Sequence, residues 1–316
     1  MLKIGKSYVA YRGKRARLCA DITVEGRKMT LWFAVDRRRR DCLALGRADA
    51  FVMSLLNMAA ERREDILCED PMSERLHYQL GNYLTPLLSL KGVSIEAPLE
   101  AERFPNQGAV GTAFSGSIDS LYTIMCHGKE SEYPLTHLLV LNAGALEGKG
   151  RGSFCGRLWR AKVLAKSLGM EAVGIDTNLQ EALQESFYDV YPFREIACAL
   201  ALQGLCSVYL LSCGYDAAHF SLGNEGAACH NLLTVNCAST ESLTFYPSGI
   251  EEERWQKRRE LKGWRLTPWL LDLQDRDVPI PSDALTYEEQ FGRKGWFRQK
   301  KRRECNGKWD AEAENR

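Results

Sequence analysis

Short apolar runs alternate with longer amphipathic stretches through the middle of the chain. The runs 109–114, 137–141, 172–175 and 208–211 lack polar alternation, which is typical of strands covered on both faces. Helical patterns separate them, around 118–125, 156–168 and 193–205. Because helical crossovers join parallel strands, this alternation predicts a doubly wound, mostly parallel α/β sheet. Ligands of such sheets bind at the carboxyl ends of the strands, where the strand order reverses.

The first third of the chain has a different pattern. Residues 8–12, 17–24 and 29–35 are short strand-like segments separated by glycine-containing turns, which predicts a small antiparallel sheet. Two helical patterns follow, the second with Ser73 as its N-cap. We therefore expect a small α+β domain over 1–105 and a nucleotide-binding α/β domain over 106–264. A loop-rich, charged C-terminal extension is expected over 265–316.

Composition excludes several classes of protein. Of 316 residues, 45% are apolar and 26% are charged, with 42 basic and 41 acidic side chains, so the chain as a whole has no charge excess to attract nucleic acid or anionic lipid. No apolar run approaches the ~20 residues that a membrane span needs. The first residues lack the apolar core of a secretory signal. We expect a cytoplasmic protein without a membrane partner.

The eleven cysteines are scattered between Cys19 and Cys305 and never stand in a C-x-x-C pair. This spacing argues against a structural zinc site, and a reducing compartment argues against disulfides. The five histidines also show no metal-ligand spacing. Most of the cysteines are expected to be small buried apolar residues.

The sequence predicts an anion-binding loop at the junction between the apolar run 109–114 and the helical pattern that follows it. Ser115-Gly116-Ser117-Ile118-Asp119-Ser120 lies between the apolar run 109–114 and a helical pattern. A helix N-terminus presents unpaired N–H groups and a partial positive charge, which suits a phosphate. Gly116 allows close approach of the anion, and Ser115, Ser117 and Ser120 offer hydroxyl donors. Asp119 would cap the helix or hold a magnesium ion.

Residues 114–120 resemble the S-G-G-x-D-S pyrophosphate loop of the PP-loop ATP pyrophosphatases, in the adenine nucleotide α-hydrolase-like superfamily. The chain departs from that pattern at Ser117, which stands where the family usually has its second glycine. The resemblance implies a HUP-like fold, ATP and magnesium as cofactors, and cleavage between the α and β phosphates. It also implies that adenine is recognised near Ala113 and Phe114.

Three more segments occupy positions where the family places ligand contacts, each at the end of a predicted strand. They are Asn142-Ala143-Gly144, Asp176-Thr177-Asn178 and Ser212-Cys213-Gly214. Farther along, Arg254 and Lys257 are three residues apart and share a helix face. Both could neutralise phosphate charge as ATP is cleaved.

In the PP-loop enzymes that this loop resembles, ATP adenylates a substrate oxygen, and a sulfur or nitrogen nucleophile then displaces AMP. Cys213 and Cys155 are candidates for a sulfur carrier, because thiolates form near positive charge. The family includes nitrile-forming deazaguanine enzymes and glutamine-dependent synthetases. The first are disfavoured because their C-terminal cysteine cluster for zinc is missing here, and the second because no amidotransferase domain is recognised before residue 100. We expect a small-molecule or nucleobase substrate, slightly favouring thiolation of a purine-like base, a sulfur or nitrogen donor protein, and a homo-oligomer.

Two alternatives stay open. Ser117 could crowd the pyrophosphate, which would leave a nucleotide-binding protein with weakened catalysis. The basic run 37–40 could instead belong to a transfer-RNA-modifying enzyme of the same class, although such enzymes usually carry a strongly basic extra domain.

Overall fold

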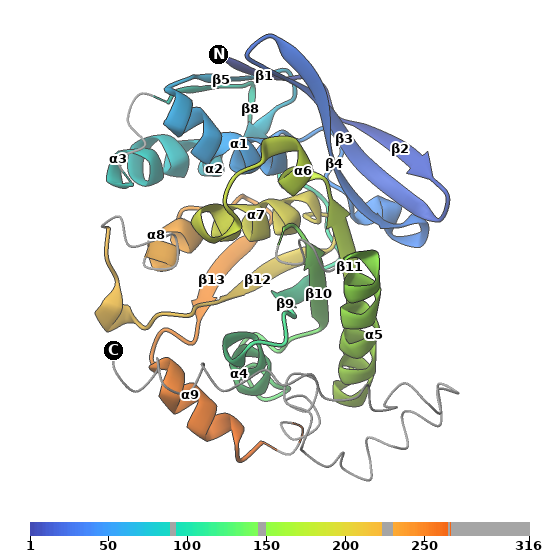
Figure 1. The fold of residues 1–316 in the computed structure, drawn as a ribbon, viewed down its shortest axis with the longest axis vertical. Helices are drawn as coiled ribbons and strands as arrows, with labels where there is room; N and C mark the ends of the chain where they lie inside the picture. The colour runs from blue at the N-terminus through green and yellow to red at the C-terminus, as the bar shows by residue number, and fades with distance from the viewer. Residues whose placement is uncertain (89–92, 145–149, 223–229, 265, 267–316) are drawn as a thin grey trace. The chain divides into compact units, whose positions relative to one another are not determined.

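A mixed 11-stranded sheet runs through the computed structural model, which describes residues 1–88, 93–144, 150–222, 230–264 and 266 (Figure 1). Its order is β13-β12-β9-β10-β11-β4-β3-β1-β5-β7, with β2 paired to β3. Residues 1–265 form one compact unit. Apart from Leu266, the expected extension over 265–316 lies outside the described residues.

The four expected parallel strands are confirmed as β9 (Ala109–Ala113), β10 (His137–Asn142), β11 (Glu171–Thr177) and β12 (Cys206–Ser212). A fifth strand, β13 (Thr244–Ser248), joins them. All four pairings among them are parallel. In chain order their arrangement reads 3-2-1-4-5 across the sheet, which is the Rossmann-like order of doubly wound sheets. The order reverses at β9, where crossovers to opposite faces meet.

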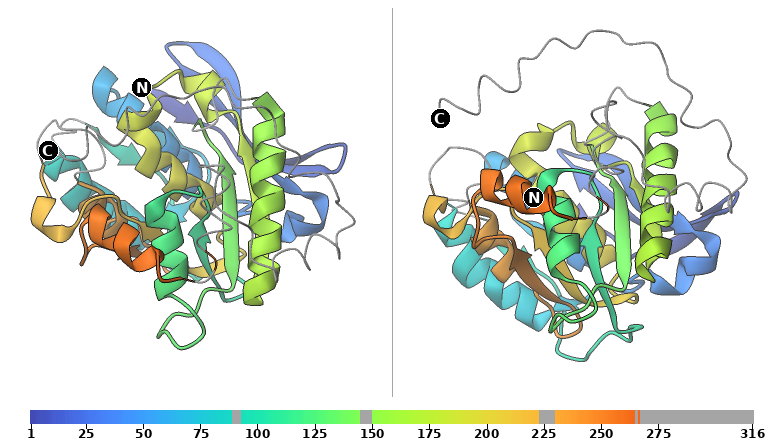
Figure 2. Two further views of the ribbon diagram at one scale, coloured as in Figure 1. Left: turned by 60° about the horizontal axis from the view of Figure 1, so that its bottom comes forward. Right: turned by 90° about the horizontal axis from the view of Figure 1, so that it is seen from below.

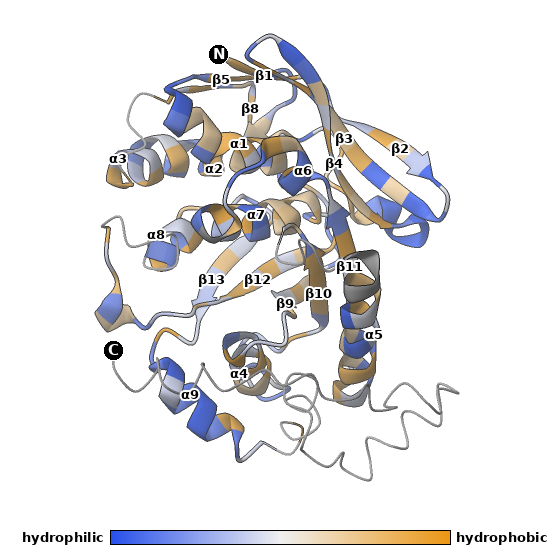
Figure 3. Cartoon of the chain, viewed as in Figure 1, coloured by the Kyte–Doolittle hydropathy of each residue, from blue (hydrophilic) through white to orange (hydrophobic). Residues whose placement is uncertain are grey.

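Helices cover both faces of these strands (Figures 1 and 2). On one face lie α4 (Ile118–Cys126), α5 (Gly150–Leu168) and α9 (Arg254–Leu261). On the other lie α1 (Asp49–Arg62), α6 (Leu179–Leu183), α7 (Phe187–Ala201) and α8 (Asn231–Asn236). The orange segments of Figure 3 gather along the inner strands and the helix sides that face them. This distribution matches a sheet buried on both faces.

The first third adds further strands to the same sheet. The antiparallel strands β2 (Tyr8–Arg12), β3 (Arg15–Val24) and β4 (Arg27–Asp36) are confirmed. In addition, β1 (Leu2–Ile4) pairs with β3, and β5 (Ile66–Cys68) and β7 (Ile95–Glu96) extend the sheet in parallel beyond it. The predicted antiparallel strands are thus part of a larger mixed sheet, to which β1, β5 and β7 also belong. These short strands escaped prediction because two or three residues carry no periodicity.

The N-terminal strands continue directly into the parallel strands. β4 pairs antiparallel with β11, with Ala34 opposite Asp176 and Phe33 opposite Thr177. α1 also packs against α7, and Phe33 meets Phe51 edge to face at 5.6 Å. Both phenylalanines are fully buried. The sheet thus crosses the boundary expected near residue 105 without interruption.

The remaining elements are short. Ser73 caps α2 (Glu74–Gln79) as predicted, accepting from the Leu76 amide at 2.9 Å. A π turn η2 (Leu80–Leu84) and α3 (Thr85–Leu87) follow α2, and η1 (Arg37–Cys42) and η3 (Ala217–His219) are 3₁₀ turns. The strands β6 (Met72–Ser73) and β8 (Leu99–Glu100) form a separate pair. α7 begins six residues before the predicted helix and includes Pro192; burial of its apolar side against α1 offsets the hydrogen bond that proline removes.

Candidate functional site

The loop after β9 opens α4 in the geometry that the sequence predicted. Phe114 continues the strand, with its amide donating to the Leu139 carbonyl at 2.8 Å. Gly116 then has a φ of 80°, in the left-handed region that favours glycine. Ser117 is the N-cap of α4, and its hydroxyl accepts from the Ser120 amide at 3.3 Å. Ser117 therefore caps α4, which was one of the two roles expected of Asp119.

Three hydroxyls converge at this helix start. Ser115 Oγ lies 2.9 Å from Ser117 Oγ and 3.1 Å from Ser120 Oγ, and it accepts from the Ser117 amide at 3.2 Å. The first amides of a helix, here those of Ile118 and Asp119, have no carbonyl within the helix to accept from them. The helix start therefore combines hydroxyl donors, unpaired amides and the positive end of the helix dipole.

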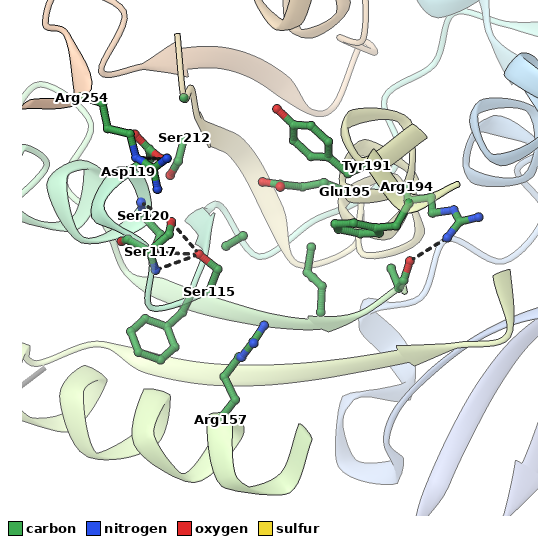
Figure 4. A pocket seen from close by; sticks show the side chains of 16 residues that line it. Ser115, Ser117, Asp119, Ser120, Arg157, Tyr191, Arg194, Glu195, Ser212 and Arg254 are labelled. Atoms are coloured by element: carbon green, nitrogen blue, oxygen red, sulfur yellow. Dashed lines mark hydrogen bonds and ion pairs between the residues drawn. The ribbon is translucent and has the colours of Figure 1, made fainter. Parts of the chain in front are cut away.

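A cavity of about 400 Å³ opens directly against this loop, a size typical of small-molecule sites. Figure 4 shows its lining side chains, which come from the ends of β9, β10 and β12 and from helices on both faces of the sheet. It is lined by Ala113, Phe114, Ser115, Ser117, Asp119, Ser120, Leu141, Ala143, Arg157, Phe187, Tyr191, Arg194, Glu195, Ser212, Gly214 and Arg254. The cavity thus lies where the strand order reverses, at the expected edge of the sheet.

Asp119 is held between two cations of α9. Its Oδ1 lies 3.5 Å from Lys257 Nζ, and its Oδ2 lies 3.8 Å from Arg254 Nε. Lys257 is fully buried and also donates to the Cys213 carbonyl at 2.7 Å. Arg254 lines the cavity and has a side chain that is 58% exposed. The structure therefore brings three predicted site residues together, with Arg254 facing the ligand space and Lys257 behind Asp119.

A second cation, Arg157, points into the cavity from α5 (Figure 4). Burial, followed by the neighbouring Arg160, lowers its pKa. Among the described residues, no carboxylate forms an ion pair with Arg157. A half-buried guanidinium without an acidic partner favours an anionic ligand.

The α7 end of the cavity carries an acidic and an aromatic group. Glu195 accepts a hydrogen bond from the Tyr209 hydroxyl at 2.9 Å, and burial raises the pKa of its carboxyl to about 7. Tyr191 accepts from the Asn231 side-chain amide at 2.6 Å, which fixes its ring beside Phe187. This end suits an uncharged, planar group rather than a second phosphate.

Arg194 is different from the other two cavity arginines because protein groups already surround it. Its guanidinium donates to the Ala143 carbonyl at 3.2 Å and to the Gln180 side chain, and it lies 3.9 Å from the Glu185 carboxylate. The side chain is only 1% exposed. Arg194 thus holds the end of β10 in place and is not a free anion contact.

Besides Gly116, three expected nucleotide contacts at strand ends lie outside the cavity lining. Asn142 donates to Asp176 Oδ1 at 2.7 Å, and Arg15 of β3 forms an ion pair with the other oxygen of Asp176. Thr177 Oγ1 accepts from the Leu179 amide at 2.8 Å and so helps to start α6. These polar groups connect β10, β11 and the N-terminal strands. The strand-end segments contribute Ala143, Ser212 and Gly214 to the cavity instead.

Neither candidate cysteine lines the cavity. Cys213 is 2% exposed, its Sγ lies 3.6 Å from the Leu211 carbonyl, and burial raises its pKa to about 12. That environment stabilises the thiol and not the thiolate that a sulfur carrier needs. Cys155 is exposed on α5. The structure therefore gives no support to a sulfur-carrying role for Cys213.

The site does not fit a magnesium ion held by the protein. Among the described residues, no group of three or more His, Cys, Asp or Glu side chains could hold a metal. Asp119 is a single carboxylate, already paired with two cations. A magnesium ion at this site would need ligands besides the side chains that the structure describes.

Sequence reasoning missed Arg157, Tyr191 and Glu195. They lie on helices 40 to 80 positions beyond the loop, and only the tertiary fold brings them to it. The sequence did contain a signal about Cys213. Successive side chains at the end of β12 point to opposite faces, so if Ser212 and Gly214 reach the cavity, Cys213 between them must point away.

Comparison with protein-family models, curated proteins and solved structures finds no match to this chain. None of its described helices has the length and apolar character to cross a membrane.

Proposed function

We propose that this protein binds ATP with its magnesium ion and cleaves it between the α and β phosphates. The observation that carries the proposal is the Ser115–Ser120 helix start, which opens into the same cavity as Arg157, a guanidinium that no carboxylate of the described residues pairs with. Amides, hydroxyls and a cation converge there on one space, which is the arrangement that a pyrophosphate group requires. The resemblance of residues 114–120 to the PP-loop pyrophosphate loop supports the same assignment.

In the proposed reaction, the outer phosphates lie on the helix start of α4. Arg157 and Arg254 neutralise the charge that develops on pyrophosphate as it leaves. Lys257 holds Asp119 in position from behind. The α-phosphate passes to a carbonyl or carboxyl oxygen of a small molecule or nucleobase, which lies toward Phe187 and Glu195.

A sulfur or nitrogen nucleophile then attacks the adenylated carbon, the carbon–oxygen bond breaks, and AMP leaves. Of the described cysteines, none lines the cavity. A sulfur atom would therefore come from an external donor, as would a nitrogen atom.

The test uses the full chain with α-labelled ATP, magnesium and a panel of carboxylates and nucleobases. We expect AMP and pyrophosphate in equal amounts. Asp119→Asn should reduce their release at least ~100-fold, because it removes the partner of both α9 cations. The matched control is Asp41→Asn, at an exposed aspartate of η1, which should leave release unchanged. Release of ADP and phosphate would refute the assignment.

A second candidate, nucleotide binding without cleavage, is favoured by one observation. Ser117 uses its hydroxyl to cap α4 and thereby occupies the Ser120 amide, which a phosphate oxygen would otherwise reach. Calorimetry would then show ATP binding, while no substrate of the panel yields pyrophosphate.

A further inference from the structure

A basic and aromatic surface lies on one face of the β2–β3–β4 strands. Arg12 is directly opposite Arg15, Arg17 is opposite Ala10 and Ala34, and Trp32 is opposite Cys19. Opposed residues of antiparallel strands share a face, and so do alternate residues of one strand. Arg12, Arg15, Arg17 and Trp32 therefore lie on one side of the sheet, called here the arginine face.

The other side of the same strands is core. Ala16, Leu18, Ala20 and Ile22 of β3 are at most 1% exposed. On the arginine face, by contrast, Arg12 is exposed, and Arg17 and Trp32 are half-buried. Figure 1 shows the β2–β3 end of these strands projecting beyond α5. The arginine face is thus open to a partner in the described part of the chain.

Arg15 has two carboxylates beside it, Asp36 directly opposite on β4 and Asp176, but Arg12 has a like charge opposite it. Like charges directly opposite each other destabilise a strand pair, yet Arg12 faces Arg15. Burial, and next the nearby Arg12, lowers the pKa of Arg17. Within the described residues, Arg12 and Arg17 form no ion pair with a carboxylate, whereas Arg15 pairs with Asp176. An anionic partner would relieve this repulsion.

The aromatic side chains of the arginine face indicate which kind of anionic partner it suits. The guanidinium of Arg17 lies 4.0 Å from the centre of the Trp32 ring system, and Tyr8, on the same face, is 42% exposed. Flat aromatic and guanidinium groups on an open sheet provide stacking surfaces for unpaired bases, while the positive charge follows the phosphates. An acidic peptide would use the charge, but aspartate and glutamate side chains have no ring to stack.

The arginine face also leads to the cavity. Arg15 lies 5.9 Å from the centre of the Phe154 ring on α5. Phe154 precedes Arg157 by three residues, less than one helical turn. Arg157 in turn lines the cavity. A chain bound on the arginine face can therefore follow a basic path from the N-terminal strands to the phosphate end of the site.

We propose that the arginine face binds single-stranded nucleic acid. Arg12 and Arg17 contact the phosphates, and the Arg17–Trp32 pair stacks against a base. The near-neutral composition of the whole chain does not oppose this, because the relevant charge is local. The inference is independent of ATP cleavage, since binding is measured without ATP.

The experiment is fluorescence anisotropy of the full chain with labelled oligo(U) and oligo(dT) of about 12 nucleotides. Binding is measured from about 50 to 200 mM salt. Arg12→Ala/Arg17→Ala should weaken binding at least ~10-fold and reduce the salt slope by about 1.4, since two phosphate contacts are lost. Arg17→Lys keeps the charge but not the planar group, and should weaken binding about 5-fold.

The matched control is Arg258→Ala/Arg259→Ala, which removes two exposed arginines of α9 and should leave binding unchanged. Circular dichroism verifies that each variant is folded. Absence of binding at about 50 mM salt would overturn the proposal, as would unchanged binding by Arg12→Ala/Arg17→Ala. Equal competition by poly-glutamate of the same charge would overturn it in favour of an acidic protein partner.

Discussion

Replacing Lys257 by methionine tests whether the buried ion pair behind the Ser115–Ser120 loop organises the site. The ammonium of Lys257 is fully buried, 2.7 Å from the Cys213 carbonyl and 3.5 Å from Asp119 Oδ1. Methionine preserves the packing volume but leaves Asp119, whose side chain is 14% exposed, with the exposed Arg254 as its cation. An exposed pair contributes little, about 0–1 kcal/mol.

The magnitude follows from what is lost. A hydrogen bond from a charged group contributes about 1.5–3 kcal/mol, and breaking a buried ion pair costs about 3–5 kcal/mol. Relief of the desolvated ammonium offsets part of that cost. We therefore expect Lys257→Met to lower the free energy of unfolding by about 3 kcal/mol, and Asp119→Asn to lower it by a similar amount. The double variant should lose about 2 kcal/mol less than the sum of the two.

The assay is urea denaturation monitored by circular dichroism, with a double-mutant cycle over the two positions. One continuous sheet joins residues from β7 to β13, so we expect a single transition to dominate. Lys262→Met, at an exposed position directly after α9, is the control and should change stability by less than about 0.5 kcal/mol. A coupling below about 0.5 kcal/mol between Lys257 and Asp119 would refute the reasoning.

Three further predictions concern the cavity. Arg157→Met should weaken ATP binding about 10- to 100-fold by calorimetry without lowering stability, because the guanidinium is partly desolvated and has no acidic partner among the residues that the structure describes; unchanged affinity would contradict its role. Ser117→Gly should lower the free energy of unfolding by only a few tenths of a kcal/mol, because glycine is also tolerated as an N-cap. It should increase pyrophosphate release, because it frees the Ser120 amide. The raised pKa of Glu195, about 7, favours its neutral form in the folded state. Its contribution to stability is therefore complete below the ordinary pKa near 4.5 and is lost as pH rises through 7. Glu195→Gln should gain about 3 kcal/mol relative to the parent over that interval, and parallel pH–stability curves would show that the carboxyl is not desolvated.

The sequence predicted those parts of the molecule that local patterns determine. Continuous apolar runs located the parallel strands, and the strand-to-helix junction located Ser115–Ser120. The spacing of Arg254 and Lys257 correctly placed them on one helix face, but it did not reveal that Lys257 lies behind Asp119. That difference depends on the packing of α9 against α4, which no local pattern encodes.

Other parts depend on contacts between distant segments. Asn142 and Asp176 each end a strand, as predicted, yet they bond to each other because β10 and β11 are adjacent and in register. Arg157 and Glu195 belong to helices whose side chains meet only at the edge of the folded sheet. The pairing of β4 with β11 involves just two residue pairs, too few to leave a periodic signal.

The junction between β4 and β11 has a consequence for dissection of the protein. A fragment beginning at residue 106 would leave the backbone donors and acceptors of β11 at a new sheet edge and uncover the side of α7 that packs on α1. Unprotected edges of this kind recruit other chains and aggregate. The half of the chain from β9 to α9 and the N-terminal strands should consequently resist separation by limited proteolysis and denature as partners, not as independent modules.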